Sequence, residues 1–412
     1  MRNWLTKTVL ILSLVSLLND AASELLFPVL PLWMKQAGYG LLWIGIAEGI
    51  AEAVAGLTKG WFGQWSDRRG ERLPFVRLGY LLGALAKPLL PLIAAAPWAV
   101  FMRSTDRLGK GMRSGARDAM LAAEAAPEQR GRVFGFHRSM DTLGAVIGPL
   151  LALLWLWHHP GGEYTQLFAL ALIPGLLSVL LLLTLREKKT PSVNRKPPPF
   201  WGAFSYWKRA GSDYKKLTGW LLLFALFNSS DMFLLLLAHE ILPAQLSIAG
   251  QIFSADFCVV GLYIFYNLIY ALMAYPAGWL SDKFHPRIML SIGLIAFAAT
   301  YAGMGWMCLH SDAPMMMLPV FFLVYGFYTA CTDGVSKAWL STLCAKTDKG
   351  TAMGLQSGLT SIAALVASSA AGIIWSAAGS EFVFWPAATA AVLCVAGLWL
   401  AGPKQKSIEQ NI

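Results

Sequence analysis

Long apolar runs alternate with short clusters of charged residues, glycine and proline along the whole chain. Residues 168–185, 217–238 and 291–309 are examples, and each is close to the roughly 20 residues that a helix needs to cross a bilayer. The pattern predicts an all-α membrane protein with twelve transmembrane helices. Their approximate cores are residues 8–35, 41–62, 74–96, 98–122, 133–157, 165–185, 217–238, 256–280, 287–309, 315–343, 351–377 and 382–402.

The composition agrees with a membrane protein and excludes other classes. Hydrophobic residues make up 56% of the chain and charged residues 14%, whereas a soluble protein has about 25% charged residues. The net charge of +10 fits lysines and arginines retained in cytoplasmic loops, so nucleic-acid binding is not expected. The cysteines form no C-x-x-C pair and the histidines lack metal-ligand spacing. We therefore expect no metal, no cofactor and no enzymatic activity.

A basic segment at residues 186–216 divides the chain, and it contains three consecutive prolines. Such a segment cannot bury a core, and its charge predicts a cytoplasmic linker. We expect residues 1–185 to form an N-terminal six-helix bundle, and residues 217–412 a C-terminal six-helix bundle with a short cytoplasmic tail. Six spans on each side of the linker place both termini in the cytoplasm, at the inner membrane of a bacterial cell. Within the linker, the aromatic residues at 200–207 fit either a short interfacial helix or an unstructured linker with aromatic anchors.

The two halves repeat parts of each other's sequence. GQWSDRRGERLPFVRLG (63–79) corresponds to GWLSDKFHPRIMLSIG (278–293), and residues 115–135 align without gaps with residues 334–354. A weaker match places Asn19 over Asn228. Two similar six-helix halves are typical of a transporter that arose by duplication.

The segment GQWSDRRGER (63–72) resembles the loop 2–3 signature of the major facilitator superfamily, and residues 278–287 resemble its degenerate copy in loop 8–9. The resemblance implies two pseudo-symmetric bundles that work by alternating access. It also implies a conformational gate that holds the cytoplasmic side closed, formed by Gly63, Asp67, Arg68, Gly70, Arg72 and Asp282. A carboxylate is stabilised at a helix N-terminus, and Gly350-Thr351 is the candidate N-terminus for Asp67.

Further segments extend the resemblance over nearly the whole chain. Arg103 with Gly109 resembles the fourth-helix motif whose arginine is linked to proton coupling. Gly144, Gly148 and Pro149 resemble the fifth-helix motif associated with antiporters, although the trailing Gly-Gly pair of that motif is replaced. DAASE (20–24), DRLGKGMR (106–113), GFHRSMD (135–141), NSSD (228–231) and DGVSKA (333–338) are similar to signatures of a little-characterised prokaryotic branch of the superfamily. Such signatures imply a fold and leave the solute open.

Carboxylates occur on one face of each of the first two spans. A charge inside the bilayer costs several kcal/mol unless it faces water or a partner, so these faces are expected to meet protein or a cavity. A buried carboxylate can change its protonation near neutral pH, which proton coupling requires. The proton-coupling candidates are Asp20, Glu24, Glu48 and Glu52.

The fourth span carries five cations on one face, which suggests that the solute has an anionic group. The substrate-binding candidates are Arg103, Arg107, Lys110, Arg113, Arg117, Asn228 and Asp231. The alternative is that these cations form internal ion pairs with the carboxylates of the first two spans. Asp333 and Lys337 are four residues apart, which predicts a structural ion pair within one helix.

These patterns predict a proton-coupled secondary active transporter that moves a small organic solute, anionic or zwitterionic, by alternating access. The antiporter-like fifth helix favours efflux. The cationic fourth span favours the alternative, a proton-symport importer of an anionic metabolite or a siderophore-like chelate. A non-transporting receptor or scaffold is disfavoured, because it has no need for charges inside the bilayer. The expected partners are the solute, protons and lipid, and the expected state is a monomer.

Overall fold

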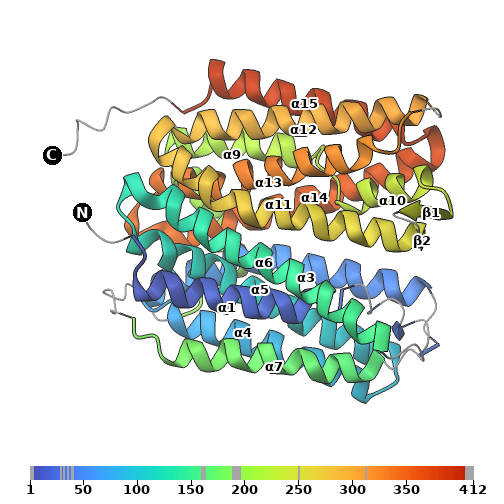
Figure 1. Cartoon of the computed structure of the whole chain (residues 1–412). Coiled ribbons are helices and arrows are strands. Elements are labelled where there is room, and N and C mark those ends of the chain that lie inside the picture. Colours follow the sequence, from blue (N-terminus) through green and yellow to red (C-terminus); the bar gives the residue numbers. More distant parts are fainter. Residues whose placement is uncertain are drawn as a thin grey trace.

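The computed structural model describes residues 4–27, 30, 33–34, 37–38, 41–158, 164–187, 196–248, 251–310 and 313–403. The long helices run roughly parallel to one axis (Figure 1). At one end of this bundle α1 begins and α15 ends, and we call it the linker end. At the other end lies a β-hairpin, and we call it the hairpin end.

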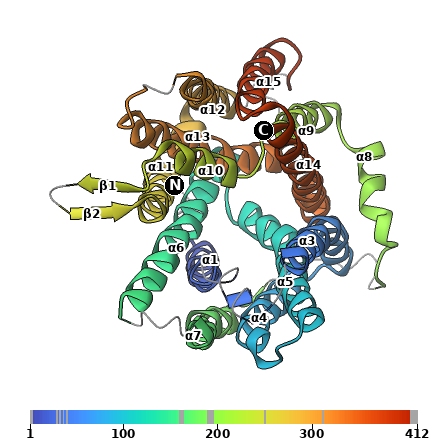
Figure 2. The same ribbon diagram turned by 90° about the vertical axis from the view of Figure 1, so that its right-hand side faces the viewer.

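The N-terminal half consists of helices only, among the residues described. They are α1 (Lys7–Glu24), α3 (Leu41–Arg69), α4 (Leu73–Leu89) with η1 (Leu90–Leu92), α5 (Ala96–Glu124), η2 (Pro127–Gln129), α6 (Arg130–His158) and α7 (Tyr164–Leu183). Viewed from the hairpin end, this half lies on one side of the molecule, opposite the C-terminal helices (Figure 2).

The C-terminal half contains one span that is split into two helices. Its elements are α9 (Ser212–Ala225), α10 (Met232–Ile241), β1 (Gln245–Ile248), β2 (Gln251–Ser254), α11 (Ala255–Phe284), α12 (Pro286–Leu309), α13 (Met317–Thr342), η4 (Lys346–Asp348), α14 (Lys349–Ala378) and α15 (Glu381–Leu400). The seventh span was expected as one helix at 217–238, but it begins at Ser212 and is interrupted between Ala225 and Met232. The interruption contains Asn-Ser-Ser-Asp, whose side chains compete with the helix for backbone hydrogen bonds.

Seven helical segments in the described residues are long and apolar enough to cross a membrane by length and composition. The helix α5 is not among them because lysines and arginines interrupt every apolar stretch of it, and α9 and α10 are each short. Together with these, the remaining helices make up the twelve spans that the apolar runs predicted.

The linker between the halves contains two short helical segments in the part that the structure describes. It contains η3 (Phe200–Ser205) and α8 (Tyr206–Arg209), which agrees with the expected short helix rather than with an unstructured linker. The Trp61 indole donates a 2.9 Å hydrogen bond to the Pro198 carbonyl, and the Gln64 amide donates a 3.2 Å bond to the Gly202 carbonyl. The linker is therefore fixed to α3 at the linker end.

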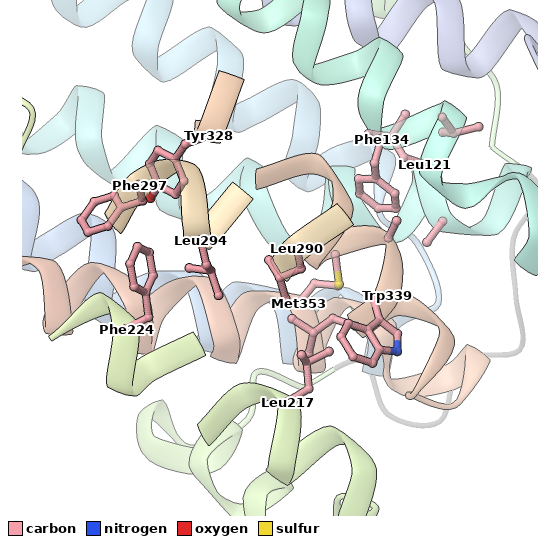
Figure 3. Packing of buried hydrophobic residues seen from close by; sticks show 14 of the residues in the cluster. Leu121, Phe134, Leu217, Phe224, Leu290, Leu294, Phe297, Tyr328, Trp339 and Met353 are labelled. Atoms are coloured by element: carbon pink, nitrogen blue, oxygen red, sulfur yellow. The ribbon is translucent and has the colours of Figure 1, made fainter. Parts of the chain in front are cut away.

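The halves touch most closely at the linker end, where α3 packs on α14 and α6 packs on α11. A Cβ added to Gly63 would lie 2.2 Å from the Gly350 carbonyl oxygen, and one on Gly278 would lie 2.1 Å from that of Gly131. Only glycine permits this approach. A continuous apolar cluster covers both halves here, and its members include Leu121, Phe134, Leu217, Leu290, Trp339 and Met353 (Figure 3).

Candidate functional site

A cavity of about 500 Å³ lies between the two halves. We call it the central cavity. Six basic residues line it, namely Lys59, Lys110, Arg113, Arg117, Arg138 and Lys337. Four acidic residues line it as well, namely Asp20, Asp141, Asp231 and Asp333. A space of this size and polarity between two bundles suits a small polar solute.

A smaller cavity of about 90 Å³ lies within the N-terminal half, bordered by α1, α4, α5 and α7. We call it the side cavity. Its charged lining consists of Asp20, Glu24, Lys87, Arg103, Asp106, Arg107, Lys110 and Arg113. Asp20, Lys110 and Arg113 belong to the walls of both cavities. A change of charge at any of these three residues therefore alters the electrostatic potential in both cavities.

Close packing between α1 and α6 positions Asp20 at this shared wall. A Cβ added to Gly144 would lie 2.4 Å from the Leu17 carbonyl oxygen, and one on Gly148 would lie 2.6 Å from the Leu25 amide nitrogen. The glycines of the antiporter-like motif thus have a packing role in the N-terminal half. Among the described residues Asp20 forms no ion pair, and it accepts a 3.4 Å hydrogen bond from the Asn19 amide.

The other candidate carboxylates have different surroundings. Glu24 accepts a 3.0 Å hydrogen bond from the Tyr263 hydroxyl of α11, which joins the two halves. Glu52 lies 3.5 Å from the Arg107 Nε, so the alternative of an internal ion pair is correct for this residue. The side chain of Glu48 is outside the part of the structure that is described.

The cations of α5 fall into two groups. Arg103 and Lys87 lie 3.7 Å and 3.0 Å from the Asp106 carboxylate. Arg107 pairs with Glu52, as above, and Arg117 lies 3.1 Å from the Asp118 carboxylate. Three cations of α5 therefore have acidic partners, and so does Lys87 of α4. The lysine of span three had not been recognised as a partner, although a lone lysine in an apolar span was a usable signal.

Lys110 and Arg113 form the second group, because neither has an ion pair among the described residues. The guanidinium of Arg113 lies 4.4 Å from the centre of the Tyr80 ring, and its Nη1 has no hydrogen-bond partner within the described part of the chain. Arg113 is buried and Lys110 is exposed. Both of these positive charges face the cavities without a neutralising carboxylate in contact.

Two ion-pair systems cross between the halves. Lys337 of α13 lies 3.3 Å from the Asp118 carboxylate of α5. Arg138 of α6 pairs with Asp141 on its own helix and with Asp333 of α13. The expected pair between Asp333 and Lys337 was therefore wrong. Each of the two side chains finds its partner on the facing bundle, where burial strengthens the attraction.

The C-terminal wall of the central cavity is built around the interrupted seventh span. Asp231 accepts hydrogen bonds of 2.6 Å from the hydroxyls of Tyr266 and Tyr325. The Asn228 amide donates a 3.1 Å bond to the Tyr328 hydroxyl. The sequence had placed Asn228 and Asp231 among the substrate candidates but did not identify these tyrosine partners. This wall is polar, and Asp231 is the acidic group that the interruption itself contributes.

The carboxylate of Asp67 binds the N-terminus of α14, as expected. It accepts hydrogen bonds from the amides of Gly350 (3.2 Å) and Thr351 (2.6 Å) and from the Thr351 hydroxyl (2.9 Å). Arg72 lies 2.9 Å from the same carboxylate. The chain turns directly after α3 at Gly70, where φ is +70°. These contacts join the two halves at the linker end.

Asp282 repeats this arrangement on the other side of the interface. It accepts hydrogen bonds from the amides of Gly131 (2.7 Å) and Arg132 (2.9 Å) at the beginning of α6. The duplicated signature of the sequence therefore corresponds to a duplicated contact between a carboxylate and a helix N-terminus.

Two six-span bundles around a charged central cavity define a membrane transporter. The profile of the Major Facilitator Superfamily matches residues 12–263 and 220–411. The chain belongs to this superfamily, and it is a multi-pass secondary transporter.

Relatives agree with this assignment, and a solved structure agrees with the fold. An uncharacterized MFS-type transporter of Methanocaldococcus jannaschii is 33% identical over 374 residues, which are 90% of this chain and 89% of the relative. The multidrug resistance protein MdtH of Photorhabdus laumondii is 30% identical over 135 residues, 32% of this chain and 33% of MdtH. The crystal structure of the human organic anion transporter MFSD10 has a TM-score of 0.79 and 17% identity, and the match covers 95% of this chain and 99% of that one.

Proposed function

We propose that this protein is a proton-coupled transporter that carries a small organic solute with an anionic group, together with protons. The observation that carries the proposal is the wall formed by Asp20, Lys110 and Arg113. The wall contains two cations and one carboxylate. None of the three forms an ion pair among the described residues. The wall faces the central cavity.

We infer the anionic group of the solute from the cations of the central cavity that have no carboxylate in contact. Arg117, Arg138 and Lys337 line the central cavity but each contacts a carboxylate. Lys59, Lys110 and Arg113 remain to attract an anion, because none of them has an ion pair among the described residues. An arginine can hold a carboxylate or phosphate through two parallel hydrogen bonds. Asp231 on the opposite half accommodates a zwitterion equally well, because its carboxylate can meet an ammonium group.

The proton and the solute are linked through Asp20. When its carboxylate is ionised, it competes with an anionic solute for Lys110 and Arg113. When it is protonated, that competition ends and a negative charge is removed from the cavity. Proton binding and anion binding therefore favour each other, which is the condition for symport. An inward proton gradient then drives uptake.

Exchange of the solute against protons is the second candidate, and it leads to efflux. The relative named as a multidrug resistance protein favours it, over the 32% of this chain that the match covers. The antiporter-like glycines that first suggested efflux are accounted for by the packing of α6 on α1. The local geometry around Asp20 therefore gives symport of an anion the stronger support.

The proposed topology places the linker end in the cytoplasm. The basic linker and the arginines after α3 lie at this end, and Lys and Arg are enriched in cytoplasmic loops. Asp67 and Asp282 then act as a conformational gate, because each joins the halves at the cytoplasmic side. Opening of this side requires both carboxylates to leave the helix N-termini that they contact.

The test is transport by purified protein in liposomes of known orientation with an imposed pH gradient. Matched organic anions, zwitterions and neutral solutes are added while the internal pH is recorded. Proton movement in the same direction as an anionic solute supports symport, and opposite movement supports the second candidate. Solute movement without proton movement contradicts proton coupling.

A further inference from the structure

The side cavity is too small for the solute that the central cavity can hold. Its volume is about 90 Å³, compared with about 500 Å³ for the central cavity. One water occupies about 10–15 Å³ on this scale, so the side cavity has room for about six to nine waters, or for a small ion with part of its water. A charged occupant of the side cavity is therefore smaller than the solute that the central cavity can hold.

The charge of the lining selects an anion. Five basic and three acidic residues line the side cavity, so the surplus is positive even with every carboxylate ionised. Among the acidic residues, Asp106 is already held by Lys87 at 3.0 Å and by Arg103 at 3.7 Å. Lys110 and Arg113 are the two basic residues of this lining that have no ion pair among the described residues.

An unsatisfied donor points to the position of the anion. Arg113 is 6% exposed, and its Nη1 has no hydrogen-bond partner among the described residues. A Cβ built on Gly83 would lie 3.5 Å from this Nη1, 3.1 Å from the Asp106 Oδ1 and 3.6 Å from the Lys87 Nζ. The unpaired Nη1 of Arg113 therefore lies next to the ion pair between Lys87 and Asp106. Both of these residues line the side cavity, so this nitrogen is on the side of the guanidinium that faces it. A buried donor without a partner costs about 1–3 kcal/mol, which a bound anion would remove.

We propose that the side cavity binds a small inorganic anion of the size and charge of chloride. Arg113 and Lys110 hold it, and the cationic side chain of Arg107 contributes to the field. This binding does not depend on the proposed function. Because Lys110 and Arg113 also line the central cavity, the anion neutralises charge that would otherwise attract the solute. It therefore weakens the binding of an anionic solute, and this second part does rest on the proposed function.

Chloride itself is the probe for binding. The melting temperature of the purified protein is measured in chloride and in gluconate at equal ionic strength, with no solute present. A ligand that binds only the folded protein raises the melting temperature in proportion to the logarithm of its concentration above the dissociation constant. We expect the melting temperature to rise with the logarithm of the chloride concentration, and to show no such rise in gluconate. Equal melting temperatures in the two salts overturn the proposal.

A matched pair of variants separates the site from a general effect on folding. Arg107→Gln removes a cation of the side cavity and also breaks the 3.5 Å ion pair with Glu52. Glu52→Gln breaks the same ion pair but retains the cation. We expect Arg107→Gln to raise the apparent dissociation constant for chloride, derived from the melting temperatures, at least tenfold. Glu52→Gln should leave this dissociation constant unchanged. Loss in both variants, or in neither, contradicts the assigned site.

The link to the solute is tested separately. Chloride is expected to raise the apparent KM for an anionic solute and to leave that for a neutral solute unchanged. Unchanged KM values for both solutes overturn the link between the cavities while the chloride site stands. If no solute moves at all, the proposed function fails, but the melting measurements still decide the anion site.

Discussion

Lys337 of α13 lies 3.3 Å from the carboxylate of Asp118 in α5, and the two residues join opposite halves of the molecule. Asp118 is 1% exposed, and Arg117 is its second basic partner. In the proposed alternating-access cycle, the helices that carry these charges separate at one stage. The ion pair is therefore a contact that has to break when the linker end opens.

Replacement of Lys337 is expected to favour the state in which the linker end is open. Lys337→Gln should weaken the closed state by about 2 kcal/mol, below the 3–5 kcal/mol that is typical when one partner of a buried pair is removed, because Arg117 still neutralises Asp118. The measurement is the rate at which a thiol reagent modifies Ser341→Cys in a background without the native cysteines. Ser341 is fully buried in the closed linker end.

The expected rate of modification rises roughly 30-fold, the equivalent of that free energy. Lys216→Gln, a change at an exposed residue of α9, serves as the control and should leave the rate unchanged. An unchanged rate in Lys337→Gln means that the pair does not stabilise the closed state.

The same assay tests the gate carboxylates. Asp67→Asn keeps the size of the side chain but loses the charge that binds the N-terminus of α14. We expect the closed state to lose about 1.5–3 kcal/mol, the range for hydrogen bonds to charged groups. Asp282→Asn should act in the same direction. Arg69→Gln removes only an exposed ion pair with Glu71 and is expected to have no effect. Similar rates in Asp67→Asn and Arg69→Gln would remove Asp67 from the gate.

The position of Asp20 should depend on Gly144. In Gly144→Ala the new Cβ would lie 2.4 Å from the Leu17 carbonyl oxygen, so α1 must move away from α6. We expect coupled transport to fall at least tenfold while the protein still folds, as judged by size-exclusion chromatography. Gly219→Ala is the control, because nothing lies within 4 Å of its added Cβ. Equal transport by the two variants contradicts the positioning role.

Arg113 should distinguish anionic from neutral solutes. Arg113→Ala removes a cation that has no ion pair among the described residues, so the loss falls on the solute rather than on an internal partner. A hydrogen bond to a charged group is worth about 1.5–3 kcal/mol, which predicts a KM for an anion that is about 10- to 150-fold higher. Arg113→Lys keeps the charge and should retain most of the preference. An equal loss for anionic and neutral solutes indicates a structural role instead.

The sequence predicted the number of spans because apolar length defines a span. The contact of Asp67 with α14 was expected from the resemblance of residues 63–72 to a known signature, together with the stabilisation of a carboxylate at a helix N-terminus. The one-sided charge on α5 likewise predicted that these residues face protein or a cavity. Such arguments use one helix at a time.

The partners across the cavity could not be predicted in this way. Asp333 and Lys337 are well placed for a pair within one helix, yet the facing half supplies Arg138 and Asp118. The choice depends on which charges the other bundle brings into the interface, and a helical wheel contains no information about that. The interruption before Met232 was missed for a related reason, since the apolar residues around it read as one continuous run.

The central claim is that protonation of Asp20 controls the binding of the solute, and Asp20→Asn tests it most directly. Asparagine is uncharged at every pH, so it mimics the protonated form of the Asp20 side chain. Reconstituted protein is compared with and without this change for solute-driven proton flux and for solute exchange across the membrane at several pH values. The account predicts that proton flux disappears, while exchange continues and no longer depends on pH between about 5 and 8. Proton flux that persists in Asp20→Asn would contradict it.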